Sequence, residues 1–166
     1  MPAKDVASII HRVQTSTQKL AEVASTLNTA SDQLGAVITQ LDAALKRLNL
    51  GLPASVVFAG NDDRNTGLFW RRDLAYTKVA GRWGLAITTS SGDLARPDQN
   101  DYEEWLFNEA PRSYRIDAVE KIPELLEKLV AEAATLTSKT VATTIQVRPV
   151  ADAIVAMVPD NTQRRK

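Results

Sequence analysis

The chain has 166 residues, enough for one domain or for one domain with a helical extension. Its 20 basic and 20 acidic residues cancel, so no overall charge attracts nucleic acid or an anionic membrane. Cysteine is absent, which excludes disulfides, thiolate nucleophiles and cysteine-based zinc sites and favours a reducing compartment. No apolar run approaches the roughly 20 residues that cross a bilayer, and Lys4, Asp5 and Arg12 interrupt any signal-peptide core. We therefore expect a cytoplasmic protein without membrane contact.

A leucine recurs at every seventh position from residue 20 to residue 48, and the repeat extends back to two valines. The d positions of this heptad pattern are Val6, Val13, Leu20, Leu27, Leu34, Leu41 and Leu48, and the a positions are Ile10, Thr17, Ala24, Ser31, Ile38 and Leu45. The unbroken repeat predicts one continuous, coiled-coil-like helix from about residue 5 to residue 49. We expect Gly51 to end this helix in the left-handed conformation and Pro53 to prevent its continuation. A hairpin that turns near residues 28–32 is the alternative, although such a turn would disturb the repeat.

The apolar stripe of this helix is wide, because the g positions are also mostly apolar, for example Ile9, Val23 and Val37. A wide stripe disfavours a simple parallel zipper and favours contact with more than one neighbour. The helix would be roughly 65–70 Å long, whereas the remaining residues would form a body only about 35 Å across. We therefore predict a homo-oligomer or a helical protein partner. The predicted oligomerisation residues are Val13, Leu20, Leu27, Leu34, Ile38 and Leu41.

The middle of the chain is rich in short β-branched and aromatic runs. Residues 54–60 and 65–73 each indicate a strand, and residues 74–91 indicate a hairpin with its turn at 80–82. Together they predict a three- to four-stranded antiparallel meander. The polar segment 91–101 contains Gly92 and Pro97, and we expect a loop there.

The last third of the chain shows helical spacing. Asn108 is a candidate N-cap with Pro111 in the first turn, and Pro123 predicts a kink or a junction between two helices. We expect the C-terminal helix to pack antiparallel on the N-terminal helix, which gives an α+β fold. Residues 137–166 stay open between helix, strand and disorder. Pro149 should break any helix that contains it, and residues 161–166 should fray.

This reading divides the chain into a long coiled-coil-like helix at 1–52, a small antiparallel sheet with C-terminal helices at 53–136, and an uncertain tail at 137–166. The segment 101–136 carries 9 acidic and 4 basic residues. A charged run of this kind is typical of a solvated helix face.

Four basic residues lie close together in the predicted sheet and alternate with aromatic residues: Arg71, Arg72, Lys78 and Arg82. Basic residues beside aromatic rings can hold single-stranded nucleic acid or an anionic ligand. Strand alternation, however, turns Trp70 and Arg71 to opposite faces. Core aromatics with basic residues on the solvent face is therefore the favoured reading, and nucleic acid is possible but not favoured as a partner.

Other polar groups give weaker indications of chemistry. Four carboxylates could supply a hydrolytic pair, but they also suit the acidic entry to a helix: Asp101, Glu103, Glu104 and Glu109. The segment Gly60–Asn65 holds oxygen donors, but its spacing fits a turn better than a metal loop. His11, the single histidine, falls on the outer face of the long helix. We expect no catalytic residue, no metal site and no cofactor.

The function that fits these features is a non-enzymatic scaffold or regulatory accessory protein that uses the heptad helix for protein–protein interaction. The alternative is a small nucleic-acid-associated regulator that uses the basic and aromatic sheet face. A carboxylate-based hydrolase is a second, weaker alternative.

Overall fold

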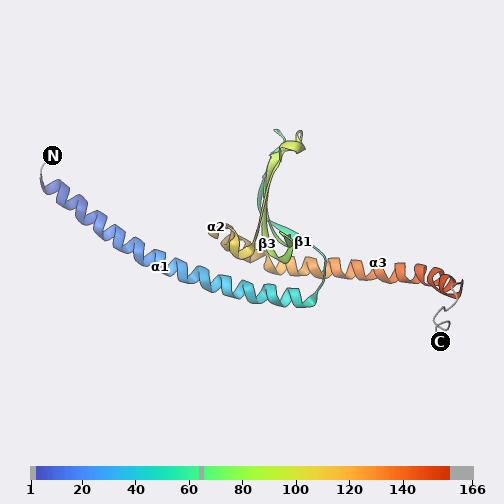
Figure 1. Cartoon of the computed structure of the whole chain (residues 1–166). Coiled ribbons are helices and arrows are strands. Elements are labelled where there is room, and N and C mark those ends of the chain that lie inside the picture. The colour runs from blue at the N-terminus through green and yellow to red at the C-terminus, as the bar shows by residue number, and fades with distance from the viewer. Residues whose placement is uncertain (1–2, 64–65, 158–166) are drawn as a thin grey trace, which may run out of the picture.

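The computed structural model describes residues 3–63 and 66–157, with side chains from residue 6 onward. Its helices and strands, in chain order, are α1 (Ala3–Leu48), β1 (Ala54–Asp62), β2 (Leu68–Val79), β3 (Arg82–Asp93), β4 (Asp101–Leu106), α2 (Arg112–Ala118) and α3 (Ile122–Met157). The fold is α+β, as predicted. Two long helices run beneath one end of a single antiparallel sheet (Figure 1).

Helix α1 is continuous, which confirms the unbroken heptad pattern and rules out the hairpin alternative. Its 46 residues extend over about 70 Å. The helix ends at Leu48, one residue before the expected end, and the left-handed residue that follows it comes two positions before Gly51. Asn49 takes the left-handed conformation with φ of 48°, and its N–H donates to the Lys46 carbonyl at 3.1 Å. Gly51 also has a positive φ, but it lies in the loop that follows.

The sheet has four strands in the order β1-β2-β3-β4, and all neighbours are antiparallel. Ala80 and Gly81, with φ of 48° and 81°, form the predicted turn between β2 and β3, because both positions of such a hairpin turn need positive φ. Strand β2 is a single strand where we predicted two. The fourth strand is β4, and the predicted helix entry at residues 101–109 is wrong. This segment pairs with β3 instead.

The C-terminal third contains the predicted helix junction at Pro123. Helix α2 ends at Ala118, a short 3₁₀ turn spans Val119–Lys121, and Pro123 lies in the first turn of α3, where a proline is well tolerated. Pro149 does not break the helix, contrary to prediction, because α3 continues to Met157. A proline removes one hydrogen bond while the turns on either side keep theirs. Residues 137–157 are thus helical, and the predicted frayed end at 161–166 lies outside the described residues.

One hydrophobic core joins all parts of the fold. It includes Ile38 and Leu45 from α1, Leu125 and Leu129 from α3, and a row of sheet residues: Ala54, Val56, Leu74, Tyr76, Leu85 and Ile87. Helix α3 packs on α1 through this shared core, as predicted. The two helices nevertheless run in the same general direction (Figure 1), whereas we expected them to be antiparallel.

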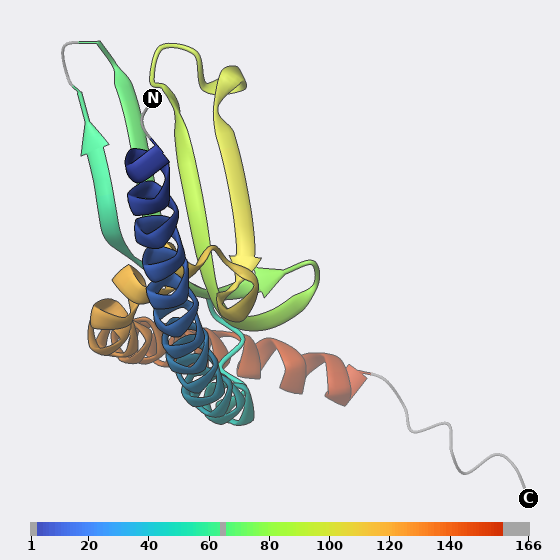
Figure 2. The same ribbon diagram turned by 90° about the vertical axis from the view of Figure 1, so that its left-hand side faces the viewer.

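Both helices extend beyond the core, in opposite directions (Figure 1). All side chains from residue 6 to residue 30 of α1 are exposed, and so are all those from 134 to 157 of α3. We call these segments the α1 arm (residues 6–30) and the α3 arm (residues 134–157), and the remainder the body. Figure 2 is viewed roughly along the α1 arm and shows the sheet standing on the two helices. Strands β1 and β3 end at the edge of the sheet that is farthest from the helices.

Candidate functional site

The α1 arm carries a row of large apolar side chains that the chain itself does not cover. Its members and their exposed fractions are Val6 47%, Ile9 51%, Ile10 52%, Val13 58%, Leu20 67%, Val23 62% and Leu27 42%. Helical spacing places most of this row on the side of α1 that faces the core farther along, at Leu34 and Ile38. The exposed row is therefore a continuation of a core-forming face.

The six predicted oligomerisation residues divide into two groups. Val13, Leu20 and Leu27 lie on the exposed arm. The other three belong to the body: Ile38 is only 2% exposed, and Leu34 and Leu41 pack against the same core. These three residues serve the folding of the chain itself. The sequence pattern could not separate the groups, because one repeat runs through both.

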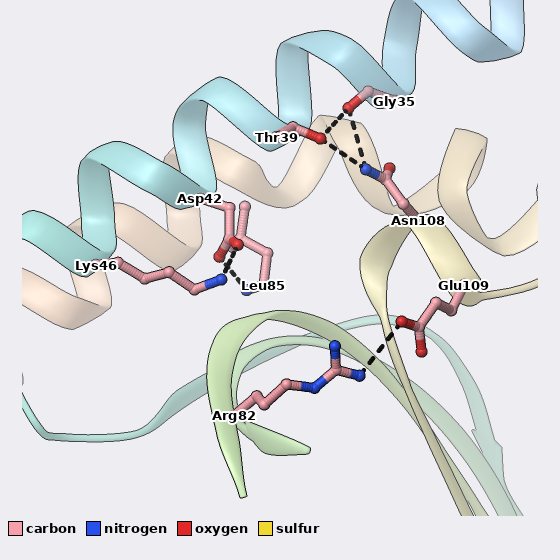
Figure 3. A network of polar contacts seen from close by, with 8 residues as sticks. All are labelled: Gly35, Thr39, Asp42, Lys46, Arg82, Leu85, Asn108 and Glu109. Carbon is pink, nitrogen blue, oxygen red and sulfur yellow. Dashed lines mark hydrogen bonds and ion pairs between the residues drawn. The ribbon is translucent and has the colours of Figure 1, made fainter. Parts of the chain in front are cut away.

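Among the described residues, the polar contacts between α1 and the body lie in the second half of the helix (Figure 3). Asp42 Oδ1 accepts a hydrogen bond from the Leu85 backbone N–H at 2.8 Å. Asn108 Nδ2 donates to the Gly35 carbonyl at 3.1 Å and to Thr39 Oγ1 at 3.0 Å.

Asn108 is therefore not the predicted N-cap: Pro111 occupies that position before α2. The contact nearest the N-terminus comes from Arg112, whose Nη2 donates to Asn28 Oδ1 at 2.8 Å. The contacts from the body thus end at the inner end of the arm, and the apolar row begins there.

The α3 arm also bears an exposed face, but of different character. Its inner side continues the spacing of Leu125 and Leu129 through a mixture of aliphatic and threonine residues: Leu136, Thr140, Thr143, Val147, Val150 and Ile154. An open groove of about 660 Å³ follows this side between Leu136 and Asp152. The α3 arm exposes eight large apolar side chains, but only five of them share this face: Leu136, Val147, Val150, Ile154 and Met157. The other three, Val141, Ile145 and Val155, point to other sides of the helix, whereas all seven exposed apolar residues of the α1 arm lie on one side.

The four basic residues considered as a possible anion or nucleic-acid contact do not form one surface. Arg71 and Arg72 lie on opposite faces of β2. Arg71 Nε pairs with Asp73 Oδ2 at 2.9 Å, whereas the Arg72 guanidinium lies 4.1 Å from the centre of the Tyr114 ring and 5.1 Å from that of Trp70.

The remaining two basic residues lie toward the β2–β3 turn, where each has a partner of its own. Lys78 Nζ is 5.6 Å from the centre of the Trp83 ring. Arg82 Nη2 pairs with Glu109 Oε1 at 3.4 Å (Figure 3). The arrangement is that of basic side chains packed on aromatic rings or paired with carboxylates, which leaves no shared track for a phosphate backbone.

A polar cleft of about 390 Å³ lies on the Arg71 side of the sheet. It brings together Arg71, Asp73, Thr88 and Tyr102 from three strands with Lys128 from α3. Asp73 is only 5% exposed and is paired with Arg71, while Lys128 Nζ donates to the Ser55 carbonyl at 2.8 Å.

Sequence reasoning did not find this cleft, because its residues come from all four strands and α3. The one indication in the sequence was the spacing of Arg71 and Asp73, which places both side chains on the same face of a strand. Burial, together with a hydrogen bond to Glu104 and its charge, raises the pKa of Tyr102 above its usual range. Tyr102 therefore stays protonated and donates to Glu104 Oε2 at 3.2 Å. The polar groups of the cleft are thus bonded to one another: Arg71 to Asp73, Tyr102 to Glu104 and Lys128 to the Ser55 carbonyl.

The predicted carboxylates are also dispersed. Asp101 and Glu103 share one face of β4, whereas Glu104 points to the other face, and Glu109 pairs with Arg82. Asp63 accepts a hydrogen bond from Thr66 Oγ1 at 2.9 Å in the hairpin between β1 and β2, as expected for a turn. Within residues 3–63 and 66–157, no three His, Cys, Asp or Glu side chains gather as metal ligands would.

Comparisons with known proteins identify no relative of this chain. No family model matches the chain, and neither a curated protein nor a solved structure matches it significantly. Over the part of the chain that the structure describes, no helix combines the length and the apolar character of a bilayer crossing. The apolar row on the α1 arm is thus the feature that suggests a function.

Proposed function

We propose that this protein is a non-enzymatic scaffold that assembles with copies of itself through the α1 arm. The observation that carries the proposal is the exposed row from Val6 to Leu27 on a helix whose continuation builds the core. Seven aliphatic side chains, each about half exposed, leave on the order of 500–700 Å² of apolar surface, at or above the upper end of the roughly 300–600 Å² that the largest patch of a typical monomer covers.

The other features of the chain are consistent with this role. The basic and carboxylate residues that could indicate nucleic-acid binding or hydrolysis are dispersed and mostly paired, as described above. The absence of cysteine supports a reducing compartment, and we place the assembly in the cytoplasm. The sheet and α2 would then be presented outward from the assembled helices as a recognition surface.

Light scattering after size exclusion tests the proposal. The wild-type chain at micromolar concentration should have at least twice the mass of one chain. The double variant Leu20→Lys with Leu27→Lys places two charges in the apolar row, so it should have the mass of a single chain.

The matched control is Gln18→Lys with Ser25→Lys. Both residues are exposed and lie on the opposite side of the same turns of α1, about 200° around the helix from their neighbours at 20 and 27. This variant adds the same charge and should keep the wild-type mass. A wild-type chain that remains a single copy, or an equal loss of assembly in both variants, would contradict the proposal.

A further inference from the structure

The apolar row of the α1 arm is symmetric about its middle. Val6, Ile10 and Val13 precede Ser16 and Thr17, and three more aliphatic residues follow at matching distances: Leu20, Val23 and Leu27. Turned end for end about a point between Ser16 and Thr17, six of the seven residues of the row fall on one another, with Val6 opposite Leu27 and Val13 opposite Leu20. The seventh, Ile9, falls opposite Ala24. A shallow groove of about 420 Å³ is lined by residues on both sides of this midpoint: Ile9, Arg12, Val13, Ser16, Thr17 and Leu20.

The position of the body decides how two such arms can meet. From Leu34 onward, the chain's own sheet and α3 cover the face of α1 that carries the row. If two arms were parallel, both bodies would lie at the same end of the paired rows. Each body covers the face of α1 that points to the partner, so the two bodies would compete for the same space. If the arms are antiparallel, Val6 of each arm lies opposite Leu27 of the other, and the two rows overlap along their whole length before the core contacts of either body begin at Leu34. The exposed row, about 32 Å from Val6 to Leu27, is then fully used.

The residues that flank the row also fit an antiparallel pair. Parallel coiled coils are usually aligned by charges at e and g positions. Here the e positions are Ala7, Gln14, Ala21 and Asn28, and the g positions are Ile9, Ser16, Val23 and Ala30. None of these residues is charged, and the alanines permit close approach of two helices. An antiparallel arrangement also places opposite ends of the two helix dipoles together.

We propose that two copies of this chain pair through their α1 arms in an antiparallel, two-fold symmetric contact with Ser16 and Thr17 at the axis. This inference rests on the proposed self-assembly and specifies its geometry. The contact is isologous, so the same patch serves both copies and the pair is closed. Its apolar area per copy is on the order of 600 Å², near the roughly 800 Å² per partner of a standard stable interface.

Engineered cysteines test the geometry directly, because the chain contains none. Three single variants are needed: Ser16→Cys, Val6→Cys and Leu27→Cys. A disulfide forms only where two Cα atoms come within about 7 Å. On mild oxidation, Ser16→Cys should link to its own copy in most molecules. Val6→Cys and Leu27→Cys should each stay unlinked alone, yet link to one another when the two variants are mixed. Ser25→Cys, on the opposite face, is the control that should stay unlinked throughout.

The outcomes separate this inference from the proposed function. Each variant is first shown by light scattering, under reducing conditions, to keep the wild-type mass, so a missing link cannot arise from lost assembly. Leu27→Cys that links to its own copy would indicate parallel arms and overturn the inference while self-assembly stands. A multimer without links at positions 6, 16 and 27 would place the contact elsewhere and also overturn it. A wild-type monomer would instead refute the proposed function itself.

Discussion

Asp42 shows how a single polar side chain can complete a sheet from outside it. Strand β4 pairs with β3 from Leu106 opposite Ala86 outward, so the Leu85 N–H lies just beyond the last pair. Asp42 on α1 supplies the missing acceptor at 2.8 Å. The same carboxylate lies near buried Tyr76, and burial together with this charge raises the pKa of Tyr76. The sequence shows only an aspartate at an e position, and it gives no sign of a partner 43 residues away.

Replacing Asp42 should therefore destabilise the fold. In Asp42→Ala the part-buried Leu85 N–H loses its acceptor, and the free energy of unfolding should fall by about 1–3 kcal/mol. Urea denaturation measures this change.

Two further variants test whether the loss of stability comes from this hydrogen bond. Asp42→Asn retains an oxygen acceptor and should recover most of the lost stability. Asp32→Ala removes an exposed carboxylate from the same helix and should change stability by less than about 0.5 kcal/mol. Equal stability of Asp42→Ala and the wild type would show that this hydrogen bond does not hold α1 to the sheet.

At the scale of elements, α1 is one helix with two environments. Its second half is built into the core through Ile38 and Leu45, and its first half has no cover within the described chain. The change falls between Leu27 and Leu34, where Asn28 meets Arg112 and Gly35 lies against Asn108. A Cβ at Gly35 would lie 3.4 Å from Asn108 Oδ1, an ordinary van der Waals distance, so an alanine would also fit beside Asn108.

Two truncations to alanine should separate these environments. Ile38→Ala removes buried apolar volume and should lower the free energy of unfolding by about 2–5 kcal/mol. Leu20→Ala removes an exposed side chain, so it should weaken assembly and leave the unfolding of the single chain within about 0.5 kcal/mol of the parent.

Unfolding is best compared in the Leu20→Lys, Leu27→Lys background for Ile38→Ala and at high dilution for Leu20→Ala. Both conditions remove the contribution of assembly. A cost for Leu20→Ala in the single chain as large as that for Ile38→Ala would mean that the arm packs against the body in solution.

The helices and strands differ in how well the sequence predicts them. Helix α1 follows from one uninterrupted repeat, and the turn at Ala80 and Gly81 follows from local chemistry. Strand β4 was missed because Tyr102-Glu103-Glu104 carries charge on both faces and glutamate favours helices. Its residues are exposed or at most half-buried, so there are no buried residues to show a period of two. The direction of α3 depends on how the four strands return the chain to α1, and no local pattern encodes that return.

At the scale of the whole molecule, the chain is far from spherical. A compact chain of 166 residues would have a radius of gyration of about 15 Å. Two arms that leave the body in opposite directions (Figure 1) must increase this value. The apolar stripe and the helix length indicated this excess of helix over body before any contact was known. Which leucines the body covers depends on where the sheet meets α1, and a repeat cannot specify that.

Small-angle X-ray scattering checks this shape. The Leu20→Lys, Leu27→Lys variant should be a single chain, and its radius of gyration should be at least about 1.5 times the compact value. A value near that of a sphere would mean that the arms fold back on the body in solution. The Gln18→Lys, Ser25→Lys variant should give a still larger radius, because it keeps the pair.

The opposite departure of the two arms determines what a pair would look like. Helices α1 and α3 run in the same general direction, and their arms leave the body at opposite ends. In a pair joined through antiparallel α1 arms, the two α3 arms would therefore lie at the two outer ends. Such a pair would be an elongated, two-fold symmetric dimer with identical ends. It could hold two like objects at a set separation, with the span determined by helix length.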